Sequence, residues 1–526
     1  MAMQEFPLGQ FLPDGADYKN PGLTMCNNVW ALPNSYAPIL DLIGQGVFVY
    51  GNIRGAFRFD LPNGDQLLVV GTETDLFVIR GDGVTASGLA LQLQENEFWS
   101  FDQFNNSIFA TTKRGGVFKL VSIESDNAFV AGLGSPPRAN AINVVGDFLL
   151  LGDLIESGEL DAPYRVRWSS YNNPDANWST DVATQSGFVD MPSRFGVVKA
   201  IYGGSFDLIF QNNGISRIWY SGGPTVFAKE VIEDERGCFA QTSIARVGAY
   251  IYFLSHDGFC RTDGASVEVI SSDKVWDWFN RTRNKNDPQR VQAAVNWSAR
   301  SIVWSFNAYR ATRTPTSLDD NDPNIVDDET LDVTGPSFDD DGEQTVYARQ
   351  IIYNWGLDQW TTSEIEADWL VQSNFIGVSV DRDAPQIEGD AALDIDGANF
   401  DDLEFASRGR DLAAFRGNQL SFFSGAPLLA TFETGDFQPK TGNHSFIRSV
   451  MPIVETSGRA LIAAIAGRDY VGDEKVYGPN STQGPLMFCP VVSDARFHSL
   501  RITIPEGEDW NKASGFQIDW EASGIA

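Results

Sequence analysis

The residue types that most often bind metals or act as nucleophiles are scarce in this chain of 526 residues. It contains three histidines and four cysteines: His256, His444, His498, Cys26, Cys238, Cys260 and Cys489. None has the spacing of an HExxH or CxxC motif, which would place two ligands on one metal ion, and four cysteines are too few for a disulfide scaffold. We therefore predict no metal site, no cofactor and no catalytic residue. His256 lies in a Ser-His-Asp-Gly sequence, which predicts an exposed turn.

Three other segments match functional motifs only in part. Gly81–Ala86 has the glycine spacing of a dinucleotide fingerprint, but no helix pattern follows it, so we interpret it as a turn. Asp320–Leu331 begins like a calcium-binding EF-hand loop, yet it has Ile325 where that loop needs glycine and Leu331 where it needs glutamate. Trp168–Trp178 resembles the Asp-box turn of sialidases, but it lacks the glycine and occurs once. The chain also has no GxSxG elbow and no phosphate-binding GxxxxGK[ST] loop.

Acidic side chains are the abundant ionisable groups. There are 70 Asp and Glu residues against 38 Lys and Arg, which gives a net charge of −32. This charge argues against a protein that grips nucleic-acid phosphates and against docking on an anionic membrane. With so many carboxylates, two that are close in sequence do not identify an acid–base pair.

The acidic residues are concentrated in one long segment. No Lys or Arg lies between Arg313 and Arg349, and the interval contains Asp319, Asp320, Asp322, Asp327, Asp328, Glu329, Asp332, Asp339, Asp340, Asp341 and Glu343. Strand-like sequences flank it, so we predict a long polar insertion within one hairpin. These eleven residues are the candidate gate or acidic loop. A second acidic stretch, Glu388–Glu404, is expected to be a linker.

The chain must position these segments on β-structure, because hairpin patterns recur along it. Apolar strands joined by Gly, Asn or Asp turns start near Leu67, Ser107, Phe206, Ala249 and Asp411. If the turns are marked at Asp75, Gly116, Gly214 and Gly258, they lie 41, 98 and 44 residues apart, and a further hairpin from Val144 divides the long step. Such a period is typical of a β-propeller, although stacked sandwiches would give similar hairpins. One short helix is expected at Ser271–Asn284, capped by Ser272.

We therefore predict an all-β protein: a β-propeller of about six blades with inserted loops, followed by a C-terminal β-sandwich-like domain. The expected divisions are an N-terminal arm at 1–45, the propeller at 46–370 with its acidic insertion near 311–348, a linker and further hairpin at 371–439, and the C-terminal β domain at 440–526. The sequence contains no signal-peptide pattern and no transmembrane pattern, so synthesis in a reducing cytoplasm is expected.

One block of sequence resembles a known family. Phe227–Phe279 has Gly-Cys, then Ser-Ile, a strand, the sequence FLSHDG and a helix with an aromatic end. In this it is similar to the packaged-DNA stabilisation proteins, or tail nozzles, of short-tailed bacteriophages. Asn20–Leu23 and Pro427–Phe437 also fit, in the same order along the chain. The acidic insertion is the main departure from the family.

The resemblance implies a structural protein of the virion tail, made in the cytoplasm of a bacterial host. It implies a homo-hexamer that closes the channel of the portal-adaptor proteins, meets tail fibre, spike or needle proteins, and lets genomic DNA pass without tight binding. The motif is not catalytic, so no site residue follows from it. Two alternatives remain: a β-propeller glycosidase or depolymerase acting on host glycans, and a non-enzymatic propeller that serves as a binding scaffold.

Overall fold

The computed structural model describes residues 2–18, 20–61, 66–176, 178–203, 207–222, 225–311, 344–373, 411–456, 458 and 460–525. Within these ranges almost all regular structure is β-strand, with one α-helix, α1 (Trp276–Thr282), and two 3-10 turns. The prediction of an all-β protein is confirmed. No helix in the described ranges combines the length and the apolar character needed to cross a membrane.

Six sheets in the described ranges are antiparallel and four-stranded. Five of them use consecutive strands: β6–β9 (Ile53–Asp60, Gln66–Thr72, Leu76–Arg80, Gly83–Ala86), β10–β13 (Ser100–Phe104, Ser107–Thr112, Gly116–Leu120, Val130–Ala131), β14–β17 (Arg138–Val145, Phe148–Glu156, Leu160–Trp168, Gly187–Asp190), β18–β21 (Val198–Tyr202, Asp207–Gln211, Gly214–Tyr220, Phe227–Glu233) and β22–β25 (Ala245–Val247, Tyr250–Leu254, Phe259–Thr262, Val267–Val269). The sixth combines β30 (Trp369–Ser373), β31 (Asp411–Arg416) and β32 (Gln419–Pro427) with β5 (Leu40–Phe48).

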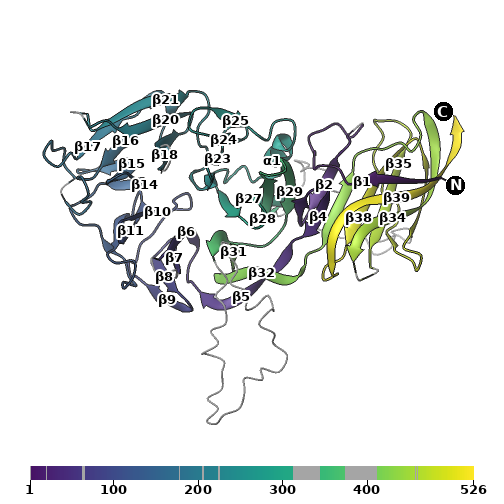
Figure 1. Ribbon diagram of the computed structural model, residues 1–526, viewed down its shortest axis with the longest axis horizontal. Coiled ribbons are helices and arrows are strands. Elements are labelled where there is room, and N and C mark those ends of the chain that lie inside the picture. Colours follow the sequence, from purple (N-terminus) through teal and green to yellow (C-terminus); the bar gives the residue numbers. More distant parts are fainter. Residues whose placement is uncertain are drawn as a thin grey trace, which may run out of the picture.

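A nine-stranded sheet contains a seventh set of four antiparallel strands: β26 (Val291–Asn296), β27 (Ser301–Ala311), β28 (Gln344–Asn354) and β29 (Gln359–Ser363). The first strands of most successive sheets contact one another, and β30 of the last sheet contacts β6 of the first. The sheets are therefore arranged around a shared centre (Figure 1). Strand β5 precedes the other sheets of the ring in sequence, whereas β30–β32 follow them. The last sheet therefore joins a segment from before the ring to segments from its end.

The remaining strands form a second group at the end of the molecule that carries both termini (Figure 1). One sheet contains β1 (Ala2–Pro7), β3 (Val29–Leu32), β4 (Ser35–Pro38), β34 (Asn443–Thr456), β37 (Cys489–Ala495) and β39 (Trp510–Ile525). The rest of the nine-stranded sheet contains β2 (Leu23–Asn27), β33 (Ala430–Thr434), β35 (Ile462–Arg468), β36 (Ser481–Thr482) and β38 (Phe497–Ile504). The segment predicted as an N-terminal arm thus supplies strands to both sheets.

Strand β2 connects the two groups. It pairs with β29 on one side and with β33 on the other. One apolar core accordingly extends from the ring into the terminal sheets, and it includes fully buried Trp304, Trp360 and Trp510. Burying side chains of this size removes a large apolar area from water, which stabilises the junction.

The predicted hairpins are confirmed, but the predicted helix cap is wrong. The hairpins from Leu67, Ser107, Phe206, Ala249 and Asp411 correspond to β7–β8, β11–β12, β19–β20, β23–β24 and β31–β32. Helix α1 begins at Trp276, and Ser272 does not cap it. The carboxylate of Asp14 accepts hydrogen bonds from the backbone N–H groups of Asp277 (2.8 Å) and Trp278 (2.7 Å). A residue more than 250 positions away therefore satisfies the free donors of this helix.

Candidate functional site

All eleven residues of the predicted gate or acidic loop lie at 319–343, within a segment (312–343) outside the described residues. The second acidic stretch lies within 374–410, which is also outside them. From the sequence, these two segments hold 20 acidic and four basic residues, so they carry −16 of the net −32. The structure describes the strands that flank them.

The hairpin that carries the predicted insertion is confirmed. β27 pairs with β28 over 11 residues each, from Ser301 opposite Asn354 to Ala311 opposite Gln344. Next to it, the N–H of Asn284 donates to the carbonyl of Asn307 at 2.7 Å. The chain just after α1 therefore holds one strand of this hairpin.

An arginine fixes the second strand against the same helix. The guanidinium of Arg349 lies 4.9 Å from the centre of the Trp278 ring and 3.2 Å from the carboxylate of Glu364. A guanidinium on an indole face combines a cation–π contact with its ion pair. The hairpin is thus anchored at both strands where segment 312–343 begins and ends.

Near its centre, the ring is bridged by polar side chains. The Gln241 amide donates to the carbonyl of Asn140 at 3.0 Å, which joins the connection before β22 to β14, two sheets away. Similarly, the Lys199 ammonium donates to the Gln289 amide at 3.5 Å, joining β18 to the connection before β26. Each of these two contacts links a sheet to the next but one in the chain, in addition to the contacts between neighbouring sheets.

Buried polar groups also join neighbouring sheets. The Gln292 amide of β26 both donates to the carbonyl and accepts from the N–H (2.8 Å) of Leu370 in β30. Asp102 of β10 accepts a hydrogen bond from the N–H of Val144 in β14. Burial raises the pKa of this carboxyl to about 6, against the opposing effect of its two backbone N–H donors. The sequence analysis missed these residues, although a single Gln in the apolar run VQAAV was a usable signal.

Within the described ranges, the histidines and cysteines do not gather into one site. All four cysteines are buried and unpaired, and burial raises the pKa of each thiol, so none is an activated nucleophile. His256 lies in the turn between β23 and β24 and is exposed, as predicted. His498 is fully buried, and desolvation lowers its pKa to about 4. In the described ranges, no three His, Cys, Asp or Glu side chains are placed to share a metal ion.

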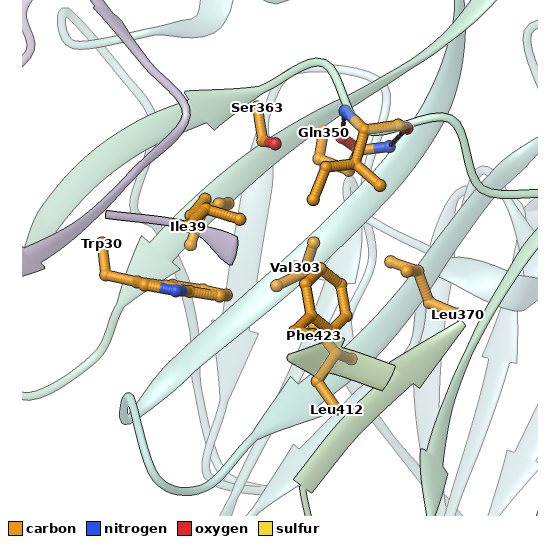
Figure 2. Close-up of a pocket in the computed structure, with 10 residues that line it drawn as sticks. Trp30, Ile39, Val303, Gln350, Ser363, Leu370, Leu412 and Phe423 are labelled. Atoms are coloured by element: carbon orange, nitrogen blue, oxygen red, sulfur yellow. Dashed lines mark hydrogen bonds between the residues drawn. The ribbon is translucent and has the colours of Figure 1, made fainter. Parts of the chain in front are cut away.

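A small cavity lies mainly between two sheets of the ring, β26–β29 and β30–β32, with Trp30 of β3 at its edge (Figure 2). Trp30, Ile39, Val303 and Phe423 line it, and its free volume is about 10 Å³, which is space for about one water molecule. Gln350 is its main polar residue, and both ends of its amide already bond to the backbone of Ile365, at 2.9 and 3.0 Å. This cavity is a packing defect and not a substrate site.

The segment that resembles an Asp box has a structural role. Its aspartate, Asp175, forms an ion pair of 2.5 Å with Lys119, a buried ammonium on β12 of the neighbouring sheet. Trp168 and Trp178, at its two ends, are buried. The carboxylate thus neutralises a buried charge and is unavailable as a catalytic acid.

Comparisons with known proteins complete the description. No protein-family model and no curated protein matches the chain. Among solved structures, it is similar to the extracellular domain of a hybrid two-component system from B. thetaiotaomicron, at 9% identity and a TM-score of 0.34, covering 87% of this chain and 47% of that one. The chain thus spans about half the length of that domain. A structure described as a glycoside hydrolase aligns at 11% identity and a TM-score of 0.24, covering 90% of this chain and 99% of that one.

Proposed function

We propose that this protein is the nozzle of a short bacteriophage tail, built from a seven-bladed β-propeller and a terminal β-sandwich. The six four-stranded sheets would be six blades, and β26–β29 would be the seventh, one more than the number expected from the sequence. Completion of the last sheet by β5 is the usual way in which such a ring is held closed. In this role the protein assembles as a hexamer on the portal-adaptor proteins and performs no chemical step.

One observation carries this proposal: the first and third of the segments that resemble the family pair with each other, and the chain just before the first contacts the end of the second. Leu23, from the first segment, lies opposite Thr434 of the third, and the N–H of Gly435 donates to the carbonyl of Gly22 at 3.1 Å. Asp14, which precedes the first segment in sequence, caps α1, and the first residues of this helix end the block Phe227–Phe279. A resemblance produced by chance would have no reason to fall on one junction between the ring and the terminal sheets.

The charge supports a DNA path that does not bind the duplex tightly. A net charge of −32 per copy would repel phosphates and let the duplex slide. In a cyclic hexamer each contact joins two different surfaces of the chain, so a ring around a shared axis is the expected product.

The test is assembly on particles that lack this protein. Purified chain is added to tailless heads carrying the adaptor, and the products are imaged by negative stain while DNA release is followed with an intercalating dye. The proposal expects a sixfold collar at the vertex and retention of the genome. A protein that forms no collar, and that releases reducing sugar from host polysaccharide, would instead support the glycosidase alternative.

A further inference from the structure

The connection between β16 and β17 presents a prearranged polar and aromatic surface. Its base is fixed by two buried tryptophans: the indole N–H of Trp168 donates to the carbonyl of Gln185 at 2.8 Å, and that of Trp178 donates to the carbonyl of Pro174 at 3.0 Å. Arg167 also donates to the carbonyl of Trp178 at 2.7 Å. With Asp175 held by Lys119, the loop has little freedom to move.

This anchored loop displays Tyr171 beside a second tyrosine from the neighbouring sheet, Tyr220. Their side chains are 53% and 49% exposed. Both rings pack against Phe148, with centroid distances of 5.6 and 5.7 Å. The hydroxyl of Tyr220 also donates to the Gln185 amide at 3.1 Å. Two half-exposed rings are thus held on one buried base, so that little conformational entropy is lost when a ligand covers them.

The hydroxyl of Tyr171 donates a hydrogen bond to the carboxylate of Asp147, and amide side chains lie on the same loop. Asn172 and Asn173 follow Tyr171 and are exposed, and the Asn172 amide accepts a hydrogen bond of 3.2 Å from Asn105. Asn105, Asn172 and Gln185 have φ angles of 53°, 51° and 58°, a conformation uncommon in residues other than glycine. All three residues lie in turns, where asparagine in particular tolerates this conformation.

We propose that this surface, formed by Tyr171, Asn172, Asn173, Gln185 and Tyr220, binds a carbohydrate. The C–H face of a pyranose ring is apolar and stacks on an aromatic ring, while its hydroxyls both donate and accept hydrogen bonds. Asn and Gln amides can also both donate and accept hydrogen bonds, so they suit the hydroxyl groups of a sugar better than they suit an ion. A nucleic acid would need cationic groups for its phosphates, and none of the five residues is charged.

The location of the surface suits recognition of an external ligand. Strands β16, β17, β20 and β21 lie at the opposite end of the molecule from the two termini (Figure 1). Sugar binding there would add to the proposed nozzle role without replacing it, and it can be tested on the isolated chain.

The first experiment is saturation-transfer difference NMR of the full chain with maltotriose, cellotriose and triacetylchitotriose. We expect transfer to the ring protons of at least one trisaccharide. The double variant Tyr171→Ala/Tyr220→Ala should weaken that signal about tenfold, as for the loss of a binding hot spot. The matched control is Tyr470→Ala, which removes a tyrosine that is 73% exposed on the terminal group of strands and should change nothing. Absence of transfer to all three sugars, or an unchanged signal in the double variant, overturns the proposal.

A second measurement guards against misfolding of the alanine variants, because both tyrosines pack on Phe148. In wild-type protein labelled with 3-fluorotyrosine, the fluorine resonances of Tyr171 and Tyr220 are assigned with the single Tyr→Phe variants. Addition of the bound trisaccharide should shift these two resonances and leave that of Tyr470 in place. Equal shifts at all three tyrosines, or none at Tyr171 and Tyr220, would refute binding at this surface.

Discussion

Replacing Asp436 with alanine should strongly destabilise the terminal sheets, because this carboxylate neutralises a buried cation. The Asp436 side chain is 1% exposed, and that of Arg468, which donates two hydrogen bonds to one of its oxygens, is 8% exposed. The other carboxylate oxygen accepts a 2.8 Å hydrogen bond from Ser499 and lies 3.4 Å from the ammonium of Lys475. Removing one member of a buried ion pair costs about 3–5 kcal/mol, since the other charge is left uncompensated.

The chain contains a matched control for this prediction. Arg448 and Glu521 also form an Arg–carboxylate pair, with 2.6 Å between nitrogen and oxygen, but their side chains are 37% and 46% exposed. An exposed pair contributes about 0–1 kcal/mol, so Glu521→Ala should have little effect. The difference between the two variants therefore isolates burial as the cause.

Native-state hydrogen exchange of the β33 and β38 amides provides the assay, because it reports the free energy of local opening in a large chain that is not expected to unfold in two states. Asp436→Ala should accelerate exchange of these amides by about two to four powers of ten, the equivalent of the predicted loss. Glu521→Ala should accelerate exchange of the same amides by less than about one power of ten. Equal effects of the two substitutions would refute the argument from burial.

Three further predictions concern single side chains: His498, Asp14 and Gln292. The pKa of His498 is lowered to about 4 in the folded protein, whereas the unfolded chain takes up that proton near pH 6.5. The free energy of unfolding should therefore fall by up to about 3 kcal/mol as the pH drops from about 6.5 to about 4. Thermal unfolding of His498→Gln should depend less on pH over this range. Asp14→Ala should destabilise α1 by about 1 kcal/mol and Asp14→Asn by less, measured as exchange of the Asp277 and Trp278 amides. Gln292→Ala should leave the N–H and the carbonyl of Leu370 without this partner, and should lower the free energy of local opening of β30 by about 2–5 kcal/mol. Hydrogen-exchange protection of the β30 amides equal to that of the wild type would contradict the bridging role.

The local part of the fold was accessible from the sequence. Each predicted hairpin has alternating apolar residues and a Gly, Asn or Asp turn, and these signals act over fewer than about 20 residues. Long-range contacts left no such signal. Nothing near Ser272 indicates that Asp14 caps the helix, and nothing near Asp175 indicates that it pairs with Lys119 of another sheet.

The candidate site shows the same division. The sequence placed the acidic insertion within a hairpin, and the paired strands β27 and β28 confirm that hairpin. It did not indicate the bridges across the ring, because Gln241 and Asn140 are about 100 residues apart and an isolated glutamine is usually a surface residue. The tyrosine surface was missed for a related reason, since Tyr171 and Tyr220 become neighbours only by packing on Phe148.

The sequence by itself determined that the chain is all-β, strongly acidic and built from recurring hairpins, since side-chain periodicity, turn residues and charge are local properties that add along the chain. Only the tertiary structure decided how the sheets close on one another, that β2 and β5 from the N-terminal region join strands far along the chain, and which charges are buried. Those outcomes depend on which apolar faces cover each other, a matter of three-dimensional packing that no short window of sequence contains.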